Sequence, residues 1–308
     1  MKVSLCILTY NRKDILYKLL SEISEIKKIE EVIVVDNAST DGTPDLFTGI
    51  YKWVNYIRND KNIGVGARNK AFEKAVGDVI ITIDDDIFGL CVDDINHIVK
   101  YFSDNDRVGA ANFKVIDASS GKVCNWIHHC RMEDYEDKTF LTYEITEGAV
   151  AFRKETLKQA GFYPEYFFIS HEGPDLAYRI MNVGYDVIYL PSVSVKHLHS
   201  EQGRKSWYRY YYDTRNQFWL AMRNFPFCYS LKFILRGLIS TLIYSLRDRF
   251  LIYWLKGVID GVFGLRVCYH DRRKLTKRTM NLIRCIDKRR PPFRYMVKRR
   301  LFRKEMRL

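Results

Sequence analysis

Three consecutive aspartates, Asp84, Asp85 and Asp86, follow the apolar run Val79–Ile83. A short, β-branched run of this kind is typical of a strand that is buried on both faces. Adjacent carboxylates at its end concentrate negative charge, which is unfavourable unless a cation shares the site. Mg²⁺ and Mn²⁺ bind one or two carboxylates together with phosphate oxygens. The run therefore predicts a metal-assisted site for a phosphate-bearing ligand at the carboxyl end of a strand, with a solvated acidic turn as the alternative.

The elements that must position these aspartates alternate between strand and helix patterns. We expect strands at 3–8, 32–35, 56–58, 79–83 and 108–115, and helices at 15–26, 66–76 and 93–102. Repeated βα units imply an α/β fold with a mainly parallel, doubly wound sheet and helices on both faces. Farther along we expect strands at 143–152 and 187–190, the latter ended by Pro191, and a helix from Pro174 to Asn182. Amphipathic helices are expected after residue 206.

Composition limits the compartment and the partners. The seven cysteines are scattered and odd in number, which favours a reducing compartment over a disulfide framework. The pair His128 and His129 between Cys124 and Cys130 lacks a second ligand pair at zinc-like spacing, so no structural metal is expected there. The apolar stretch Val3–Thr9 is too short for a signal peptide.

The net charge of +13 is concentrated at one end of the chain. Arg266–Leu308 contains 17 Lys and Arg against three acidic residues, whereas the remainder has 33 basic and 34 acidic residues. The preceding apolar stretch Phe225–Leu265 is interrupted by charges, and its longest uncharged run, Gly237–Leu246, has ten residues. A membrane span needs about twice that length. We expect a cytoplasmic protein attached peripherally to the anionic inner face of the cell membrane, with a soluble helical region as the alternative and no nucleic-acid partner.

Four ordered motifs resemble those of the family 2 glycosyltransferases, nucleotide-sugar enzymes of the GT-A fold. They are Ile7–Arg12, Val34–Thr43, Asn62–Asn69 and Ile83–Asp86, and the resemblance covers about residues 1–225. It implies a Rossmann-like GT-A catalytic domain at 1–222, with a nucleotide-binding half at 1–115 and an acceptor half at 116–222. A helical, basic, membrane-associating region would follow at 223–308.

The resemblance also assigns roles to single residues. Asp36 is expected on the nucleobase, with capping of the next turn as the alternative. Asp85 is expected on the ribose and Asp86 on the metal. The residues expected around the nucleotide sugar are Thr9, Tyr10, Asn11, Arg12, Asp36, Asn37, Ser39, Asn62, Gly64, Arg68, Asp84 and Asp85.

The segment His171–Arg179 resembles the acidic motif on the acceptor side of the family. The family usually has two adjacent acids, then a third acid two residues later. Here Gly173 replaces the second acid of the pair. Glu172 is therefore the expected general base and Asp175 the second choice. Asp175 could instead stabilise the start of its helix or pair with Arg179 one turn later.

The strand ending at His197 and His199 carries the remaining metal-ligand candidate. Both side chains lie on the same face, and family members often place a histidine here in the metal shell. We expect His197 as the ligand, with His199 left open. The segment Tyr208–Asn216 is similar to that of family members that add a single sugar, and Gln202–Trp207 does not have the spacing of the processive motif.

The resemblance implies an inverting transferase that resembles bacterial surface-polysaccharide enzymes. It would move one sugar from a UDP- or dTDP-sugar to a membrane-associated acceptor, such as a lipid-linked glycan, with Mg²⁺ or Mn²⁺ as cofactor. The alternatives are a nucleotidyltransferase and a non-catalytic sugar-nucleotide-binding protein.

Overall fold

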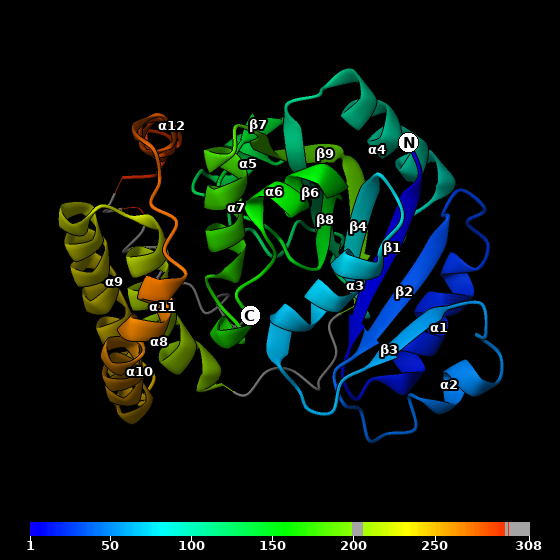
Figure 1. Cartoon of the computed structure of the whole chain (residues 1–308), viewed down its shortest axis with the longest axis horizontal. Coiled ribbons are helices and arrows are strands. Elements are labelled where there is room, and N and C mark those ends of the chain that lie inside the picture. The colour runs from blue at the N-terminus through cyan, green and yellow to red at the C-terminus, as the bar shows by residue number, and fades with distance from the viewer. Residues whose placement is uncertain (199–205, 293–294, 296–308) are drawn as a thin grey trace.

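A twisted sheet runs through the part of the protein that ends at His197 (Figure 1). The computed structural model describes residues 1–198, 206–292 and 295. In this part of the chain the sheet has nine strands in the order β3-β2-β1-β4-β8-β6-β9-β5, and β7 pairs with β9. The strands are β1 (Val3–Thr9), β2 (Glu31–Asp36), β3 (Asn55–Arg58), β4 (Val79–Asp84), β5 (Ile87–Phe88), β6 (Val108–Asp117), β7 (Phe140–Leu141), β8 (Ala149–Arg153) and β9 (Asp186–His197).

Strand direction divides the sheet into two parts. Strands β3, β2, β1 and β4 are parallel, and so are β6 and β9. Strand β8 is antiparallel to both β4 and β6, and β5 and β7 are antiparallel to β9. The predicted α/β class is confirmed, but the part of the sheet formed by β5–β9 is more mixed than the expected mainly parallel sheet.

Two strand boundaries differ from the prediction. The expected strand at 143–152 is wrong over its first half, because β8 begins only at Ala149. Pro191 does not end a strand either, because β9 continues to His197. The register against β6 shifts between Phe113 and Lys114, so the residues around Pro191 form an irregularity that needs no ladder hydrogen bond from the proline.

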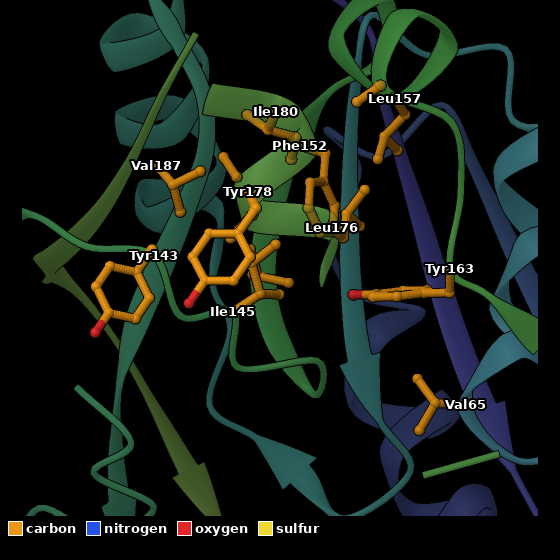
Figure 2. Packing of buried hydrophobic residues seen from close by; sticks show 14 of the residues in the cluster. Val65, Tyr143, Ile145, Phe152, Leu157, Tyr163, Leu176, Tyr178, Ile180 and Val187 are labelled. Atoms are coloured by element: carbon orange, nitrogen blue, oxygen red, sulfur yellow. The ribbon is translucent and has the colours of Figure 1, made fainter. Parts of the chain in front are cut away.

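Helices cover both faces of the sheet and create two large hydrophobic cores, beside a small third cluster of Cys130, Phe140 and Tyr189. They are α1 (Lys13–Ile23), α2 (Asp45–Thr48), η1 (Gly64–Arg68), α3 (Asn69–Lys74), α4 (Val92–Asp104), α5 (Met132–Tyr135), α6 (Lys154–Ala160), η2 (Glu165–Phe167) and α7 (Glu172–Asn182). Side chains alternate across β1, so Leu5 joins the core under α1 and α4 while Cys6 joins the core under α3, α6 and α7. Figure 2 shows the second core, with Phe152, Leu176 and Ile180 packed together.

The C-terminal helices form a group beside α7, far from β1–β3 (Figure 1). They are α8 (Tyr208–Asn224), α9 (Phe227–Arg247), α10 (Leu251–Phe263), α11 (Leu265–His270) and α12 (Lys277–Asp287). Glycines allow close helix packing here: a Cβ on Gly257 would lie 2.7 Å from the Tyr211 carbonyl oxygen. The domain boundary predicted at 222/223 falls inside α8. Met280 and Ile283 of α12 belong to the core under α7, so the basic tail begins as a packed element.

One described helix, α9, is long and apolar enough to cross a membrane by length and composition. It has 21 residues. The sequence prediction that no span-sized helix exists is therefore wrong on this criterion. The uncharged run Gly237–Leu246 is shorter than the helix that contains it. Lys232 and Arg236 interrupt the apolar sequence of α9, but they are its only charged residues before Arg247.

Candidate active site

The three aspartates lie at the carboxyl end of β4, beside the end of β1. Parallel pairing places Asp84 opposite Leu8, which brings Thr9 next to the acidic residues. Thr9 Oγ1 donates a hydrogen bond to Asp85 Oδ2 over 2.8 Å. Because β1 and β4 are both fixed in the sheet, the Asp85 carboxylate is held at the edge of the sheet where these strands end.

Arg12 lies across the acidic residues. Its Nη1 is 2.9 Å from Asp85 Oδ1 and 2.6 Å from Asp86 Oδ2. Both carboxylates are buried, and the guanidinium compensates charge that would otherwise be costly to bury. The expected clustering of Thr9, Arg12, Asp85 and Asp86 at one rim is thus present in the structure.

His197 reaches the same rim from β9. The Leu198 N–H donates to the Asp86 carbonyl oxygen over 2.9 Å, which joins the end of β9 to the acidic segment. His197 Nε2 lies 3.4 Å from Asp86 Oδ2. Its Nδ1 is 3.2 Å from Asn125 Nδ2. The second histidine candidate, His199, lies outside the described residues.

The donor atoms at this rim fit a hard divalent cation. Asp86 Oδ1 is buried and has no hydrogen-bond partner among the described residues, so one carboxylate oxygen is available to a ligand. A carboxylate oxygen with an adjacent imidazole suits Mg²⁺ or Mn²⁺. The described residues contain no ready-made group of three or more His, Cys, Asp and Glu ligands, so further ligands would come from a bound phosphate and water.

The two adjacent carboxylates have different proton affinities. Burial raises the pKa of Asp85 to about 6, against the opposing effect of Arg12. Burial acts in the same direction on Asp86, but His197 and Arg12 hold the pKa of Asp86 below its usual value. Burial alone would lower the pKa of His197, and the hydrogen bond with Asp86 raises it to about 9. Asp86 therefore keeps its negative charge to lower pH than Asp85 does.

The loop after β2 is built around Asp36. Its carboxylate is completely buried and accepts hydrogen bonds from the Ser39 N–H (2.8 Å) and the Tyr56 hydroxyl (2.6 Å). These contacts correspond to the capping of the next turn, which is the alternative to a nucleobase contact for Asp36. Asp36 shapes the loop and presents no exposed oxygen to a nucleobase in this arrangement, so the expected base contact has no support from the geometry.

Neighbouring residues connect this loop to the loop after β1. The Asn11 N–H donates to Ser39 Oγ over 2.8 Å, and Asn11 Oδ1 accepts from the Thr40 N–H over 2.7 Å. Asn37 Nδ2 donates to the Gly64 carbonyl oxygen over 3.0 Å. Tyr10 remains exposed beside these contacts. The structure thus brings these residues, which are predicted to bind the nucleotide sugar, to one edge of the sheet.

The segment Asn62–Arg68 contacts both the acidic rim and the chain that precedes Glu172. Asn62 Oδ1 accepts from the Gly64 N–H over 2.9 Å. Gly64 has φ +71°, and an added Cβ would lie 1.9 Å from the Phe168 carbonyl oxygen, so only glycine fits. Arg68 is buried, donates to Thr82 Oγ1 over 2.8 Å and pairs with Asp84. Arg68 fixes Asp84 here; its expected contact with the donor stays a prediction.

The chain before Glu172 has an unusual backbone. Phe168, Ser170 and His171 have φ values of 64°, 77° and 66°, and Glu172 follows as the buried first residue of α7. Non-glycine residues adopt positive φ at an energetic cost, and such residues gather at functional sites.

Helix α8 holds this strained loop. Asn216 Nδ2 donates to the carbonyl oxygens of Phe167 (3.0 Å), Ile169 (2.7 Å) and Ser170 (2.7 Å). Arg215 Nη2 donates to the Phe167 carbonyl oxygen over 2.7 Å. Sequence reasoning noted Arg215 and Asn216 as part of a family-like segment but missed this role.

A family comparison agrees with this arrangement of motifs. The model of the family described as Glycosyl transferase family 2 matches residues 4–159, which is half of the chain. The chain belongs to glycosyltransferase family 2. The matched region contains the three aspartates of the rim and ends before Glu172.

Curated relatives of this family 2 glycosyltransferase include two Salmonella typhimurium proteins. The O-antigen chain rhamnosyltransferase RfbN is 26% identical over 227 residues, which is 68% of this chain and 71% of that protein. The abequosyltransferase RfbV is 42% identical over 71 residues, 21% of either chain.

Solved structures with the same GT-A fold are more distant in sequence. Residues 1–349 of Staphylococcus aureus TarS, in complex with UDP-GlcNAc, align with a TM-score of 0.62 at 15% identity, covering 94% of this chain and 91% of that chain. The mannosyltransferase PcManGT from Pyrobaculum calidifontis, in complex with GDP-Man and Mn²⁺, aligns with a TM-score of 0.53 at 18% identity, covering 86% of each chain.

In this glycosyltransferase Asp175 is part of an internal ion-pair network. It is fully buried, and it contacts Arg179 Nη2 (2.9 Å), Arg223 Nε (2.9 Å) and Asn224 Nδ2 (2.7 Å). Burial opposes ionisation, but the two guanidinium groups hold the pKa of Asp175 below its usual value. The expected pairing with Arg179 is confirmed. The second-choice role of Asp175 as a base has no geometric support, because every oxygen faces the α7–α8 interface.

Proposed function

We propose that the protein is a metal-dependent, inverting glycosyltransferase that adds one sugar from a nucleoside-diphosphate sugar to a membrane-associated glycan acceptor. The observation that carries this proposal is the buried, unpartnered Asp86 Oδ1 at a rim shared with His197. In a family 2 domain, an oxygen placed there has the chemistry to bind a cation together with a diphosphate.

Asp86 and His197 would hold Mg²⁺ or Mn²⁺, which when bound supplies charge neutralisation for the leaving diphosphate. Thr9 and Arg12 hold Asp85 at the rim for the ribose. Gly64 keeps the donor side close to the loop that precedes Glu172. Glu172 takes the proton of the acceptor hydroxyl as the hydroxyl oxygen attacks the anomeric carbon.

The donor and acceptor classes rest on the relatives. RfbN is an O-antigen chain rhamnosyltransferase, and the aligned TarS structure contains UDP-GlcNAc. These names support a UDP-sugar donor and a surface-polysaccharide acceptor; the dTDP-sugar alternative and the lipid carrier are part of the proposal. PcManGT binds GDP-Man, which makes a GDP-sugar the competing donor class.

A donor panel tests the proposal. The full-length protein is incubated with UDP-, dTDP- and GDP-sugars in the presence of Mn²⁺, and release of the nucleoside diphosphate is measured with and without EDTA. We expect slow release from one donor class, abolished by the chelator. Nucleotide binding without release would favour the non-catalytic alternative, and pyrophosphate release from nucleoside triphosphates would favour a nucleotidyltransferase.

We further propose that the C-terminal helices attach the enzyme to the inner face of the cell membrane. Exposed apolar side chains form one surface on α9 and another on α10, together called the apolar face: Phe227, Leu231, Leu235, Ile239, Ile243 and Leu246 on α9, and Ile252, Leu255, Ile259, Val262 and Phe263 on α10. The α9 residues recur almost every fourth position, which places them on one side of the helix. The basic tail would add attraction to anionic lipids.

A further inference from the structure

The missing second acid of the acceptor motif is replaced in space by a residue from another segment. An added Cβ on Gly173 would lie 2.3 Å from Glu147 Oε1 and 2.7 Å from the Ile145 carbonyl oxygen. Both distances are too short for a real Cβ contact. The carboxylate of Glu147, which lies between β7 and β8, therefore occupies the volume that a side chain at position 173 would need.

Glu147 also lies next to the donor side. The following residue, Gly148, accepts a hydrogen bond from the Asp84 N–H over 3.2 Å. An added Cβ on Gly148 would lie 2.4 Å from Asp84 Oδ2, so the chain must pass close to the acidic rim here. Glu147 thus occupies the short connection between the metal-binding end of β4 and the first turn of α7.

A buried phenol provides a second, independent observation. Tyr163 is only 3% exposed, and its hydroxyl has no hydrogen-bond partner among the described residues. Burial raises the pKa of Tyr163 well above its usual value, and the charges of Glu147 and Glu172 act in the same direction. In Figure 2 the hydroxyl end of Tyr163 points toward the side of the core on which Ile145 lies.

We propose that Glu147 is the second acceptor-side carboxylate of this enzyme and that it acts with Glu172 as one unit. This inference rests on the proposed transferase function. Glu172 takes the acceptor proton, the acceptor oxygen forms the new bond to the anomeric carbon, and the bonding electrons of the sugar–phosphate bond leave with the diphosphate. Glu147 accepts a hydrogen bond from the acceptor and positions it for this step.

The test compares Glu147→Gln, Glu172→Gln and the double variant with the parent enzyme. Glu155→Gln, an exposed glutamate on α6, is the matched control. Turnover is measured with the nucleotide sugar that the parent protein consumes, and donor-site integrity by the Kd for UDP or dTDP with Mn²⁺. We expect Glu147→Gln to lower turnover by about 10²-fold, with the nucleotide Kd within about twofold of the parent value. The double variant should be no slower than the slower single variant, as for residues that act as a unit.

The outcomes separate the inference from the proposed function. Parental turnover in Glu147→Gln, with turnover lost in Glu172→Gln, would overturn the inference alone. A parent protein that consumes no nucleotide sugar would remove the proposed function and the inference with it. If Glu147→Gln does not fold, Glu147→Asp decides. This variant keeps the negative charge but moves it back by one methylene group. We expect lower turnover with unchanged nucleotide affinity. Turnover at the parental rate would overturn the inference.

Discussion

At the scale of single residues, chemistry depends on carboxylates that differ in what surrounds them. Asp86 keeps one buried oxygen without a described partner, whereas Asp175 has all its acceptor capacity directed to Arg179, Arg223 and Asn224. Both are buried acids in family-like motifs. The first is suited to binding a cation and the second to joining two helices, a difference that residue type alone does not reveal.

Asp86→Ala should therefore remove metal-dependent donor binding. Loss of a carboxylate ligand leaves His197 without its partner at the rim, and we expect Mn²⁺ to improve the nucleotide Kd by less than about twofold, against at least about tenfold in the parent. Calorimetric titration of UDP or dTDP, with and without Mn²⁺, measures this. Asp93→Ala, on the first turn of α4, is the control. A full Mn²⁺ effect in Asp86→Ala would reject Asp86 as a ligand.

The positions of the rim residues follow from local sequence patterns, because strands β1, β2 and β4 end where their apolar runs end. Contacts between segments that are distant in the sequence do not follow from such local patterns. No spacing in the sequence indicates that Asn216 bonds the carbonyls of residues 167–170, or that Glu147 fills the space above Gly173. Such contacts depend on how α7, α8 and the segment before β8 pack together, which periodicity does not encode.

At the scale of elements, α8 joins the catalytic domain to the C-terminal helices. It holds the strained loop before Glu172 through Asn216, and through Arg223 and Asn224 it binds Asp175 of α7. One helix thus fixes both ends of the segment that carries the proposed base. A backbone with three positive φ values in four residues needs such support to remain in one conformation.

Asn216→Ala should release this loop and slow the reaction without affecting the donor rim. Three carbonyl groups lose their shared donor, and we expect a loss of about 1–3 kcal/mol in the free energy of unfolding. Turnover should fall by about 10–10²-fold, because misplaced catalytic groups lose near-attack geometry. The Kd for nucleotide with Mn²⁺ should remain unchanged.

Asn281→Ala, on the exposed side of α12, is the matched control for Asn216→Ala. Denaturant unfolding and steady-state kinetics, measured on the same preparations, distinguish stability from positioning. Turnover equal to that of the parent in a folded Asn216→Ala protein would show that the loop keeps its conformation without α8.

At the scale of the whole molecule, the apolar face of α9 and α10 lies on the helical side of the enzyme, away from β1–β3 (Figure 1). The predicted helical character of this region is confirmed, and its membrane attachment remains a proposal. Helix α9 meets the length and composition of a membrane span, and its apolar residues also suit a helix lying in the interface plane. Packing of Gly257 and Gly261 of α10 against α8 favours the interfacial arrangement, because α8 belongs to the catalytic body.

The double variant Ile239→Glu/Ile243→Glu should reduce binding to vesicles of phosphatidylcholine and phosphatidylglycerol by at least about tenfold. Two charges on the apolar face would have to enter the lipid interface, which costs several kcal/mol. Co-sedimentation measures this, with Ile50→Glu, an exposed residue after α2, as the control. If the parent protein ignores vesicles and the double variant instead changes oligomeric state, the apolar face is a protein interface.

The most direct test of the proposed mechanism is nucleotide-sugar turnover by Glu172→Gln, measured alongside nucleotide affinity. Amide replacement keeps the size of the side chain and removes its ability to take a proton. The mechanism predicts a loss of about 10²–10⁴-fold in turnover, with Mn²⁺-dependent binding of UDP or dTDP unchanged. Turnover by Glu172→Gln at the parental rate would contradict it.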